Sequence, residues 1–320
     1  MRCLITGIGG FVGQYLAAWL LGRGEEVIGI TRDEVQWHRD ELRNGGPQVF
    51  VCDLLDASEV ERAIDRSAPD QVYHLAADSS VGESFANPMA VFQNNVTSVV
   101  NLLEAVRGSG GNPRVLTVGS SEVYGRATGD KAIDERVELR PESPYAVSKA
   151  AADLVAYQYF AAHHLDIVRV RPFTHIGPGQ SVRFVAASFA RQIAEIERGL
   201  RPPVIEVGNL EARRDFTDVR DMVRAYELAL AKGEPGSVYN IGRGSAVAVR
   251  TLLDVLLSQS RTAIDVRVEA SRLRQVDAPL QVCDARKFRE RTGWEPRIPL
   301  EQTLVDILEY ARAQPGPIQN

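Results

Sequence analysis

The 320-residue chain is poor in the residue types that form cross-links and metal sites. Its three cysteines, Cys3, Cys52 and Cys283, lie far apart in apolar, strand-like contexts and show no C-x-x-C spacing. This pattern excludes a disulfide framework and predicts buried, reduced thiols. The five histidines form neither an H-x-x-x-H nor an H-E-x-x-H pattern, so we expect no metal site.

Long apolar runs are also lacking. None reaches the ~20 residues of a membrane-spanning helix, and the first apolar segment belongs to a glycine motif rather than to a cleavable signal. The net charge of −5 disfavours nonspecific binding to nucleic acid but allows local basic pockets for anionic substrates. We therefore expect a cytoplasmic enzyme that binds a small molecule and acts on neither nucleic acid nor membranes.

Short apolar runs, by contrast, recur along the chain and alternate with helical patterns. The strand-like runs cover residues 4–5, 27–30, 49–51, 72–75, 115–118 and 167–170, and two long helical patterns cover 90–106 and 145–162. Strands that alternate with helices form parallel sheets. The pattern predicts an α/β protein with a Rossmann-like, doubly wound parallel sheet.

The length of the chain favours a second, smaller domain. We expect the dinucleotide-binding domain to contain residues 1–170 and returning segments near 217–245 and 280–300. A mixed α/β substrate domain would then contain residues 171–216, residues 246–279 and the C-terminal helix. The chain would thus cross between the two domains more than once.

A G-x-x-G-x-x-G motif follows the first strand-like run. Gly7 permits a tight turn, Gly10 lets the backbone approach a pyrophosphate, and Gly13 lets the following helix lie close to the strand. The amino end of that helix attracts phosphates. The motif, with Phe11 and Val12 inside it, predicts a dinucleotide pocket.

Further residues indicate which dinucleotide is bound. Arg32 ends the second strand, where NAD-binding proteins usually carry an acid, and a cation there favours the 2′-phosphate of NADPH. Asp33, the next residue, keeps NADH possible. The other cofactor candidates follow the third and fourth strands, where they would meet the adenine and run along the cofactor: Asp53, Leu54, Leu75, Ala76 and Ala77.

The catalytic signal is a Tyr145-x-x-x-Lys149 pair, preceded by Ser120 at a strand end. Because the tyrosine and the lysine are four residues apart on one helix, their side chains face the same side. We expect the ammonium of Lys149 to lower the pKa of the Tyr145 phenol toward neutrality. The phenol would then be a usable acid or base.

These motifs resemble those of the extended short-chain dehydrogenase/reductase family over essentially the whole chain. The resemblance implies that Ser120 holds the substrate carbonyl or hydroxyl, Tyr145 transfers the proton and Lys149 binds the nicotinamide ribose. Asn95 matches an asparagine whose backbone supports that lysine through water. The family commonly pairs its two long helices in a four-helix bundle, so we expect a homodimer through the helices that contain Val96 and Tyr145.

Two later segments, residues 171–180 and 207–219, resemble the GDP-4-keto-6-deoxy-D-mannose reductases, which make GDP-D-rhamnose. The resemblance implies that Arg214 approaches the diphosphate and that the segment ending at Asn209 lies near the base. Thr174 stands where asparagine is usual, which predicts a difference in substrate scope. The other substrate-binding candidates are Ser121, His175, Val185 and the pair Arg274 and Asp277, which would contact the nucleotide phosphate or ribose.

The sequence leaves other chemistries open. Glu122 matches the glutamate base of the GDP-mannose 4,6-dehydratases, although the chain lacks their T-G-Q-D-G loop and their Arg-Arg-Ser-Ser stretch, which favours reduction. A nucleotide-sugar 4-epimerase is a further alternative, because a sequence does not show to which face of the sugar the hydride is returned. A non-enzymatic NADP-binding regulator is disfavoured by the intact Tyr145 and Lys149.

Overall fold

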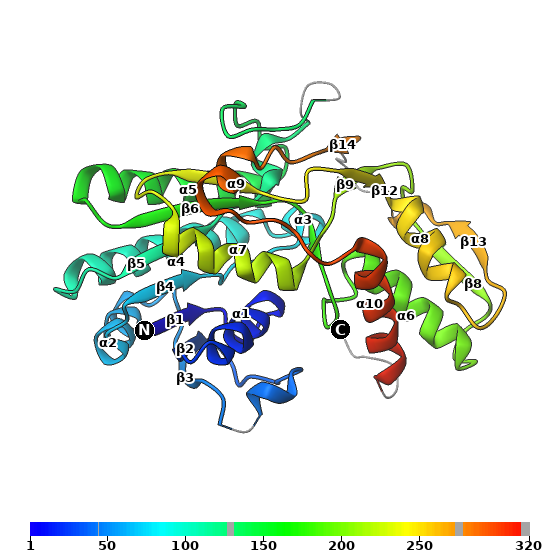
Figure 1. Cartoon of the computed structure of the whole chain (residues 1–320), viewed down its shortest axis with the longest axis horizontal. Coiled ribbons are helices and arrows are strands. Elements are labelled where there is room, and N and C mark those ends of the chain that lie inside the picture. Colours follow the sequence, from blue (N-terminus) through cyan, green and yellow to red (C-terminus); the bar gives the residue numbers. More distant parts are fainter. Residues whose placement is uncertain (44, 127–130, 273–277, 315–320) are drawn as a thin grey trace.

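The computed structural model describes residues 1–43, 45–126, 131–272 and 278–314. In these ranges a large parallel sheet with helices on both faces lies beside a smaller group of helices and short strands (Figure 1). The Rossmann-like, doubly wound fold class is confirmed. The domain limits given above stay a prediction.

The central sheet has seven strands in the order β11-β6-β5-β4-β1-β2-β3, and every neighbouring pair is parallel. Apolar, β-branched residues dominate these strands, as expected of strands buried on both faces. The strands are β1 (Arg2–Thr6), β2 (Glu26–Thr31), β3 (Gln48–Val51), β4 (Gln71–His74), β5 (Arg114–Val118), β6 (Ile167–Pro172) and β11 (Val238–Ile241).

Helices cover both faces of the sheet because alternate side chains of each strand point to opposite faces. Tyr73 of β4 belongs to the core shared with α1 (Phe11–Gly22) and α7 (Val219–Lys232). Its neighbour Val72 belongs to the core on the other face. The helices of that second face are α2 (Ala57–Ser67), α4 (Pro88–Gly108) and α5 (Pro144–His163).

The smaller region, at the right of Figure 1, has a core of its own. It is formed by α6 (Val185–Glu197), α8 (Val249–Ser258), α10 (Leu300–Ala313) and β8 (Val204–Val207), which pairs with β13 (Asp265–Val268). Short strands join this region to the rest: β12 (Ala246–Ala248), β9 (Arg213–Asp215) and β14 (Leu280–Gln281) in one sheet, and β7 (His175–Ile176) and β10 (Thr217–Asp218) in another. The remaining short elements are η1 (Asp40–Leu42), α3 (Val81–Ser84), η2 (Ser121–Tyr124), η3 (Ala270–Arg272) and α9 (Arg286–Thr292).

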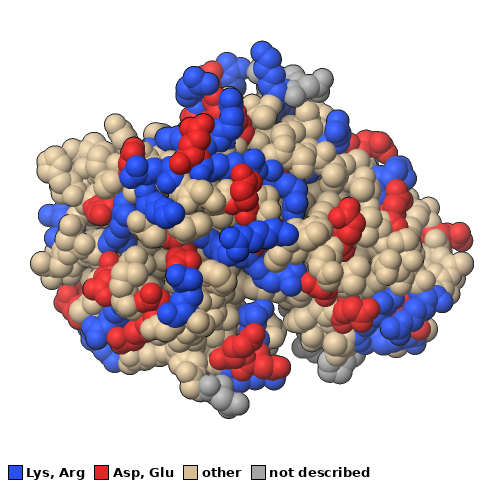
Figure 2. Space-filling view, in the orientation of Figure 1, with Lys and Arg blue, Asp and Glu red and all other residues tan. Residues whose placement is uncertain are grey.

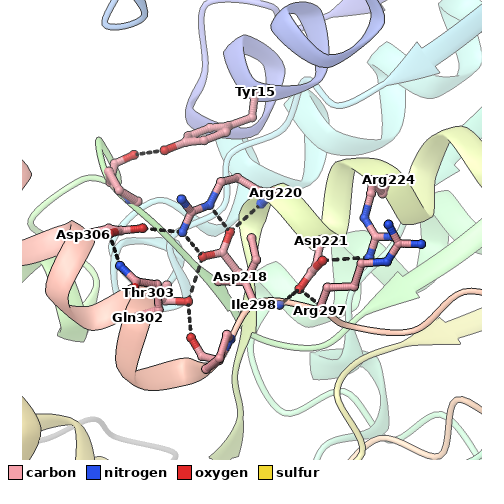
Figure 3. A network of polar contacts seen from close by, with 12 residues as sticks. Tyr15, Asp218, Arg220, Asp221, Arg224, Arg297, Ile298, Gln302, Thr303 and Asp306 are labelled. Atoms are coloured by element: carbon pink, nitrogen blue, oxygen red, sulfur yellow. Dashed lines mark hydrogen bonds and ion pairs between the residues drawn. The ribbon is translucent and has the colours of Figure 1, made fainter. Parts of the chain in front are cut away.

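Two aspartates at the amino end of α7 bind the segment that leads into α10, where the chain passes for the last time from the large sheet to the smaller region (Figure 3). Asp218 accepts a hydrogen bond from the Thr303 hydroxyl of α10 at 2.7 Å. Asp221 accepts hydrogen bonds from the backbone amides of Arg297 and Ile298 at 2.8 and 2.9 Å. Both carboxylates are buried, so these bonds fix the position of α10 against the sheet half of the molecule.

The predicted state of the cysteines is confirmed, since Cys3, Cys52 and Cys283 are all free and buried. Among the helices of the described ranges, none is both long and apolar enough to cross a bilayer. The cytoplasmic location expected from the sequence stays a prediction. On the face drawn in Figure 2, acidic and basic side chains are interspersed.

Candidate active site

The glycine turn between β1 and α1 packs too closely against neighbouring backbone to hold side chains at Gly7 and Gly13. Gly7 has a φ of +71°, and a Cβ there would lie 2.9 Å from the backbone of Ala76. A Cβ on Gly13 would lie 2.3 Å from the Gly7 carbonyl oxygen. Gly10 precedes α1 and offers no capping side chain, which leaves the first amides of the helix to an incoming group. The turn therefore fits a dinucleotide pyrophosphate.

The carboxyl ends of the strands open into a cavity of about 650 Å³, the usual position of ligands in such sheets. The walls contain residues of the large sheet and of the smaller region. Of the predicted site residues, the cavity brings together Gly7, Gly10, Phe11, Val12, Gly13, Leu75, Ala77, Ser120, Ser121, Glu122, Tyr145, Lys149, Thr174, His175, Val185, Asn209 and Arg214.

The predicted catalytic residues are placed by a well-formed helix start. Pro144 occupies the first turn of α5, and the Ser143 hydroxyl accepts a hydrogen bond from the Ala146 amide at 3.1 Å. Tyr145 lies in the same first turn and Lys149 one turn further, both only 8% exposed. Ser120, which caps η2, forms a hydrogen bond with the Tyr145 side chain.

Burial has the largest effect on the pKa values of Tyr145 and Lys149. Burial raises the pKa of Tyr145 to about 12. The hydrogen bond with Ser120 lowers this pKa, and the negative charge of Glu122 raises it slightly. Burial also lowers the pKa of Lys149 to about 8, which Asp153 opposes. The prediction that Lys149 brings the Tyr145 phenol toward neutrality is therefore wrong for this arrangement, because loss of solvation disfavours the phenolate.

Asn95 ties the two long helices together without lining the cavity. Its side-chain amide donates to the Ser148 hydroxyl at 2.9 Å and to the Asp78 carbonyl at 3.0 Å, and its oxygen accepts from the Asp78 amide at 2.7 Å. Ser148 in turn donates to the Tyr145 carbonyl at 2.7 Å. The side chain of Asn95, rather than its backbone alone, thus supports the part of α5 that carries Tyr145 and Lys149.

The other cofactor candidates are not among the residues that line the cavity. Arg32 is exposed directly after β2, and the same segment meets the glycine turn, since a Cβ on Gly9 would lie 3.3 Å from Val35. Leu54 is buried and Asp53 is exposed after β3. Ala76 lies under the glycine turn, as described above. The roles of these four candidates in cofactor binding stay predictions.

The side of the cavity predicted to bind the substrate contains β9. Arg214 lines the cavity and donates to the carbonyl of Ala278 at 2.5 Å. The next residue, Asp215, is buried and accepts hydrogen bonds from the amides of Gly244 and Cys283 at 2.7 and 3.1 Å. Burial raises the pKa of the Asp215 carboxyl, while these amides oppose the shift. Asp215 therefore holds the strand that presents Arg214.

His175 connects the two sides of the cavity. Its ring stacks on Phe11 of α1, with ring centroids 6.4 Å apart and planes 9° from parallel. Burial lowers the pKa of His175, so the ring is neutral at neutral pH. Arg274 and Asp277, the two remaining candidates, lie outside the described residues.

Sequence reasoning missed several residues of the cavity wall. They include Ser79, Val81, Gln180, Ser181, Arg183, Phe184, Ser188, Glu206, Tyr226 and Arg272. The sequence carried a signal for some of them, because Arg183 lies between the recognised segment 171–180 and the following helical pattern. Tyr226 could not have been found this way, since it lies in the middle of α7 and reaches the cavity through tertiary packing alone.

The glycine turn and the buried serine, tyrosine and lysine around one cavity define an NAD(P)-dependent enzyme of the extended short-chain dehydrogenase/reductase type. Within that class, the chain belongs to the family described as GDP-mannose 4,6 dehydratase, whose sequence profile matches residues 4–307.

The similarity to individual members extends over nearly the whole chain. A GDP-6-deoxy-D-mannose reductase from Pseudomonas aeruginosa is 33% identical over 310 residues, which are 96% of each chain. GDP-mannose 4,6 dehydratase 2 from Arabidopsis thaliana is 32% identical over 94% of this chain and 84% of its own. The solved structure of RMD from Pseudomonas aeruginosa complexed with NADPH superposes with a TM-score of 0.85, at 32% identity, and covers 98% of this chain and 99% of its own.

Proposed function

We propose that the protein reduces the C4 ketone of a GDP-linked 4-keto-6-deoxyhexose and converts GDP-4-keto-6-deoxy-D-mannose to GDP-D-rhamnose. The observation that carries the reaction is the hydrogen-bonded Ser120–Tyr145 pair above Lys149 in the cavity wall. The similarity to the Pseudomonas aeruginosa reductase over 96% of both chains supports the substrate.

In this proposal the residues of the chain position the ketone and supply its proton. NADPH, when bound, supplies a hydride. The Tyr145 phenol, with a pKa of about 12, is protonated at neutral pH and can donate to the C4 oxygen. Ser120 donates a second hydrogen bond to that oxygen, and Lys149, largely charged below its pKa of about 8, binds the ribose hydroxyls.

The charged residues of the opposite wall suit a nucleotide diphosphate. Arg214 lines the cavity on the strand that Asp215 holds, and it would contact the phosphate oxygens, because the donors of an arginine form a planar fork that pairs well with phosphates. Asn209, in the same wall, belongs to the segment that would lie near the base. Arg32, beside the glycine turn, supports a preference for NADPH over NADH.

A second candidate, a GDP-mannose 4,6-dehydratase, is favoured by one observation. Glu122 lines the cavity, and its charge raises the pKa of Tyr145, so it belongs to the same part of the wall as the proposed proton donor and could act as the base for C5. The two reactions differ in stoichiometry, because only the reductase consumes a reduced cofactor. Incubation with GDP-4-keto-6-deoxymannose and NADPH, and separately with GDP-mannose, therefore distinguishes them by NADPH absorbance and product analysis.

We also propose that the protein is a homodimer through α4 and α5. These helices lie against each other and expose large apolar side chains. The exposed apolar side chains are Met89 (75% exposed), Phe92 (39%), Val147 (42%), Leu154 (56%) and Tyr157 (47%). An exposed apolar face on paired helices favours burial against a second copy. Light scattering at micromolar concentration tests this, and a monomer mass would contradict it.

A further inference from the structure

An ion pair joins the two sides of the cavity at the protein surface. Glu83 lies on α3, shortly after β4, and Arg183 precedes α6. The Arg183 guanidinium donates a hydrogen bond to the Glu83 carboxylate at 2.5 Å, and the two residues are 100 positions apart in the chain. Both side chains are more than half exposed, so the pair lies where the cavity meets solvent.

The two partners differ in their relation to the cavity. Arg183 lines it, as do its neighbours Ser181 and Phe184, whereas Glu83 is not part of the wall. The guanidinium therefore has access to the cavity on one side and to its carboxylate partner on the other. An exposed ion pair contributes little to stability, so Arg183 can leave Glu83 at small cost.

Another arginine of the wall shows the contrast. Arg272 pairs with Glu206 at 3.5 Å, and both of these residues line the cavity, so the carboxylate partner of Arg272 lies within the wall. Glu206 shares its charge with two further arginines, Arg201 and Arg267. Release of Arg183 from Glu83, in contrast, adds an uncompensated positive charge to the wall. A group with two adjacent anionic phosphates is the ligand chemistry that such a charge favours.

We propose that Arg183 binds the diphosphate of the nucleotide sugar and that Glu83 competes with the diphosphate for the Arg183 guanidinium. This inference rests on the proposed function for the identity of the nucleotide. When the ligand binds, the guanidinium exchanges one carboxylate for phosphate oxygens, and the ion pair across the cavity opens. Glu83 thereby lowers the affinity for ligands that use the Arg183 guanidinium and leaves the binding of ligands without phosphates unchanged.

The competition predicts opposite effects of the two single variants on GDP binding, measured by calorimetry. Arg183→Gln removes a charged hydrogen-bond donor and should weaken GDP binding by about tenfold or more. Glu83→Gln removes the competitor and should strengthen GDP binding severalfold. In the double variant the Glu83 change should have no further effect, because there is no guanidinium left to compete for.

A purely structural role of the ion pair gives a different result. If the pair only braces the cavity, either single variant breaks it, and both should change GDP affinity in the same direction, which would overturn the proposal. Arg107→Gln is the matched control, since it removes an ion pair of similar exposure on α4 whose arginine does not line the cavity. Its GDP affinity should equal that of the unaltered protein, and thermal unfolding checks that all variants are folded.

Three ligands separate failure of this inference from failure of the proposed function. The Arg183→Gln effect should be large for GDP and absent for guanosine, which lacks phosphates. Unchanged GDP affinity in Arg183→Gln would overturn the assignment of Arg183 and leave the proposed function intact. If the unaltered protein instead binds UDP and not GDP, UDP affinity should be lowered in Arg183→Gln and raised in Glu83→Gln. That result would support the role of Arg183 and contradict the assignment of guanine as the base. Failure to bind either diphosphate would overturn both.

Discussion

The Arg171 guanidinium donates a hydrogen bond of 2.6 Å to the Asp153 carboxylate, one turn of α5 beyond Lys149. Arg169 donates to the same carboxylate at 3.0 Å, and all three side chains are at most 9% exposed. Arg171 also donates to the Tyr124 hydroxyl at 2.9 Å, in the short helix that follows Ser120. This buried group therefore fixes α5, which carries Tyr145 and Lys149, against the loop that carries Ser120.

Removal of the Asp153 charge should strongly destabilise the fold. Asp153→Asn leaves two buried guanidinium groups without their counter-ion, and breaking a buried ion pair in this way costs about 3–5 kcal/mol. Urea denaturation measures the free energy of unfolding. Glu138→Gln, which removes a highly exposed partner of Arg140, is the control and should change stability by about 1 kcal/mol or less. Equal effects of the two variants would contradict the structural role of Asp153.

The sequence alone predicts the sheet and the position of the cavity at the carboxyl ends of its strands, because both depend on local patterns. The runs around Leu4, Val72 and Val115 are apolar since both faces of their strands are covered, and they form β1, β4 and β5. Parallel strands bring their carboxyl ends to one edge. For that reason the glycine motif and Ser120 can be assigned to one cavity before any coordinates are known.

The properties that the sequence did not predict depend on tertiary contacts. The raised pKa of Tyr145 follows from burial, which no spacing rule gives. Arg183 and Glu83 meet although 100 residues separate them. The side-chain bond from Asn95 to Ser148 similarly requires that α4 and α5 pack in one particular register.

The pH dependence of kcat/KM should report Lys149. Because burial lowers its pKa to about 8, the ammonium is present below that pH and lost above it. Activity that needs the ammonium should therefore fall as pH rises through about 8, well below the usual range of a lysine. Lys149→Arg should retain a cation and move this alkaline decrease to higher pH. An unchanged decrease in Lys149→Arg would assign the titration to another group.

Loss of the Tyr145 hydroxyl should affect turnover more than binding. Tyr145→Phe removes the proton donor and should lower kcat by about a hundredfold or more, while the affinity for NADPH changes little. Steady-state kinetics and fluorescence titration with NADPH measure the two quantities. Tyr157→Phe removes a hydroxyl from an exposed position on the same helix and should behave as the unaltered enzyme. A comparable fall in both variants would argue against Tyr145 as the donor.

Arg32 should determine the choice between the two nicotinamide cofactors. Arg32 directly follows β2 and is exposed, at the position where we expect the 2′-phosphate of NADPH. Arg32→Ala should raise the KM for NADPH much more than the KM for NADH, because only NADPH carries that phosphate. Arg62→Ala, an exposed position on α2, provides the control. Equal changes in both KM values would remove Arg32 from the binding site.

Glu122→Gln separates reduction from dehydration. A reductase removes no proton from C5, so the variant should keep appreciable turnover of the 4-keto sugar with NADPH. A dehydratase needs the carboxylate as a base, and its turnover of GDP-mannose should be nearly abolished. Because Glu122 contributes to the raised pKa of Tyr145, the variant should also make the phenol slightly more acidic. The decisive measurement is NADPH consumed per sugar converted. One NADPH per sugar, retained in Glu122→Gln, supports reduction, whereas conversion of GDP-mannose without net NADPH loss, abolished in the variant, would falsify it.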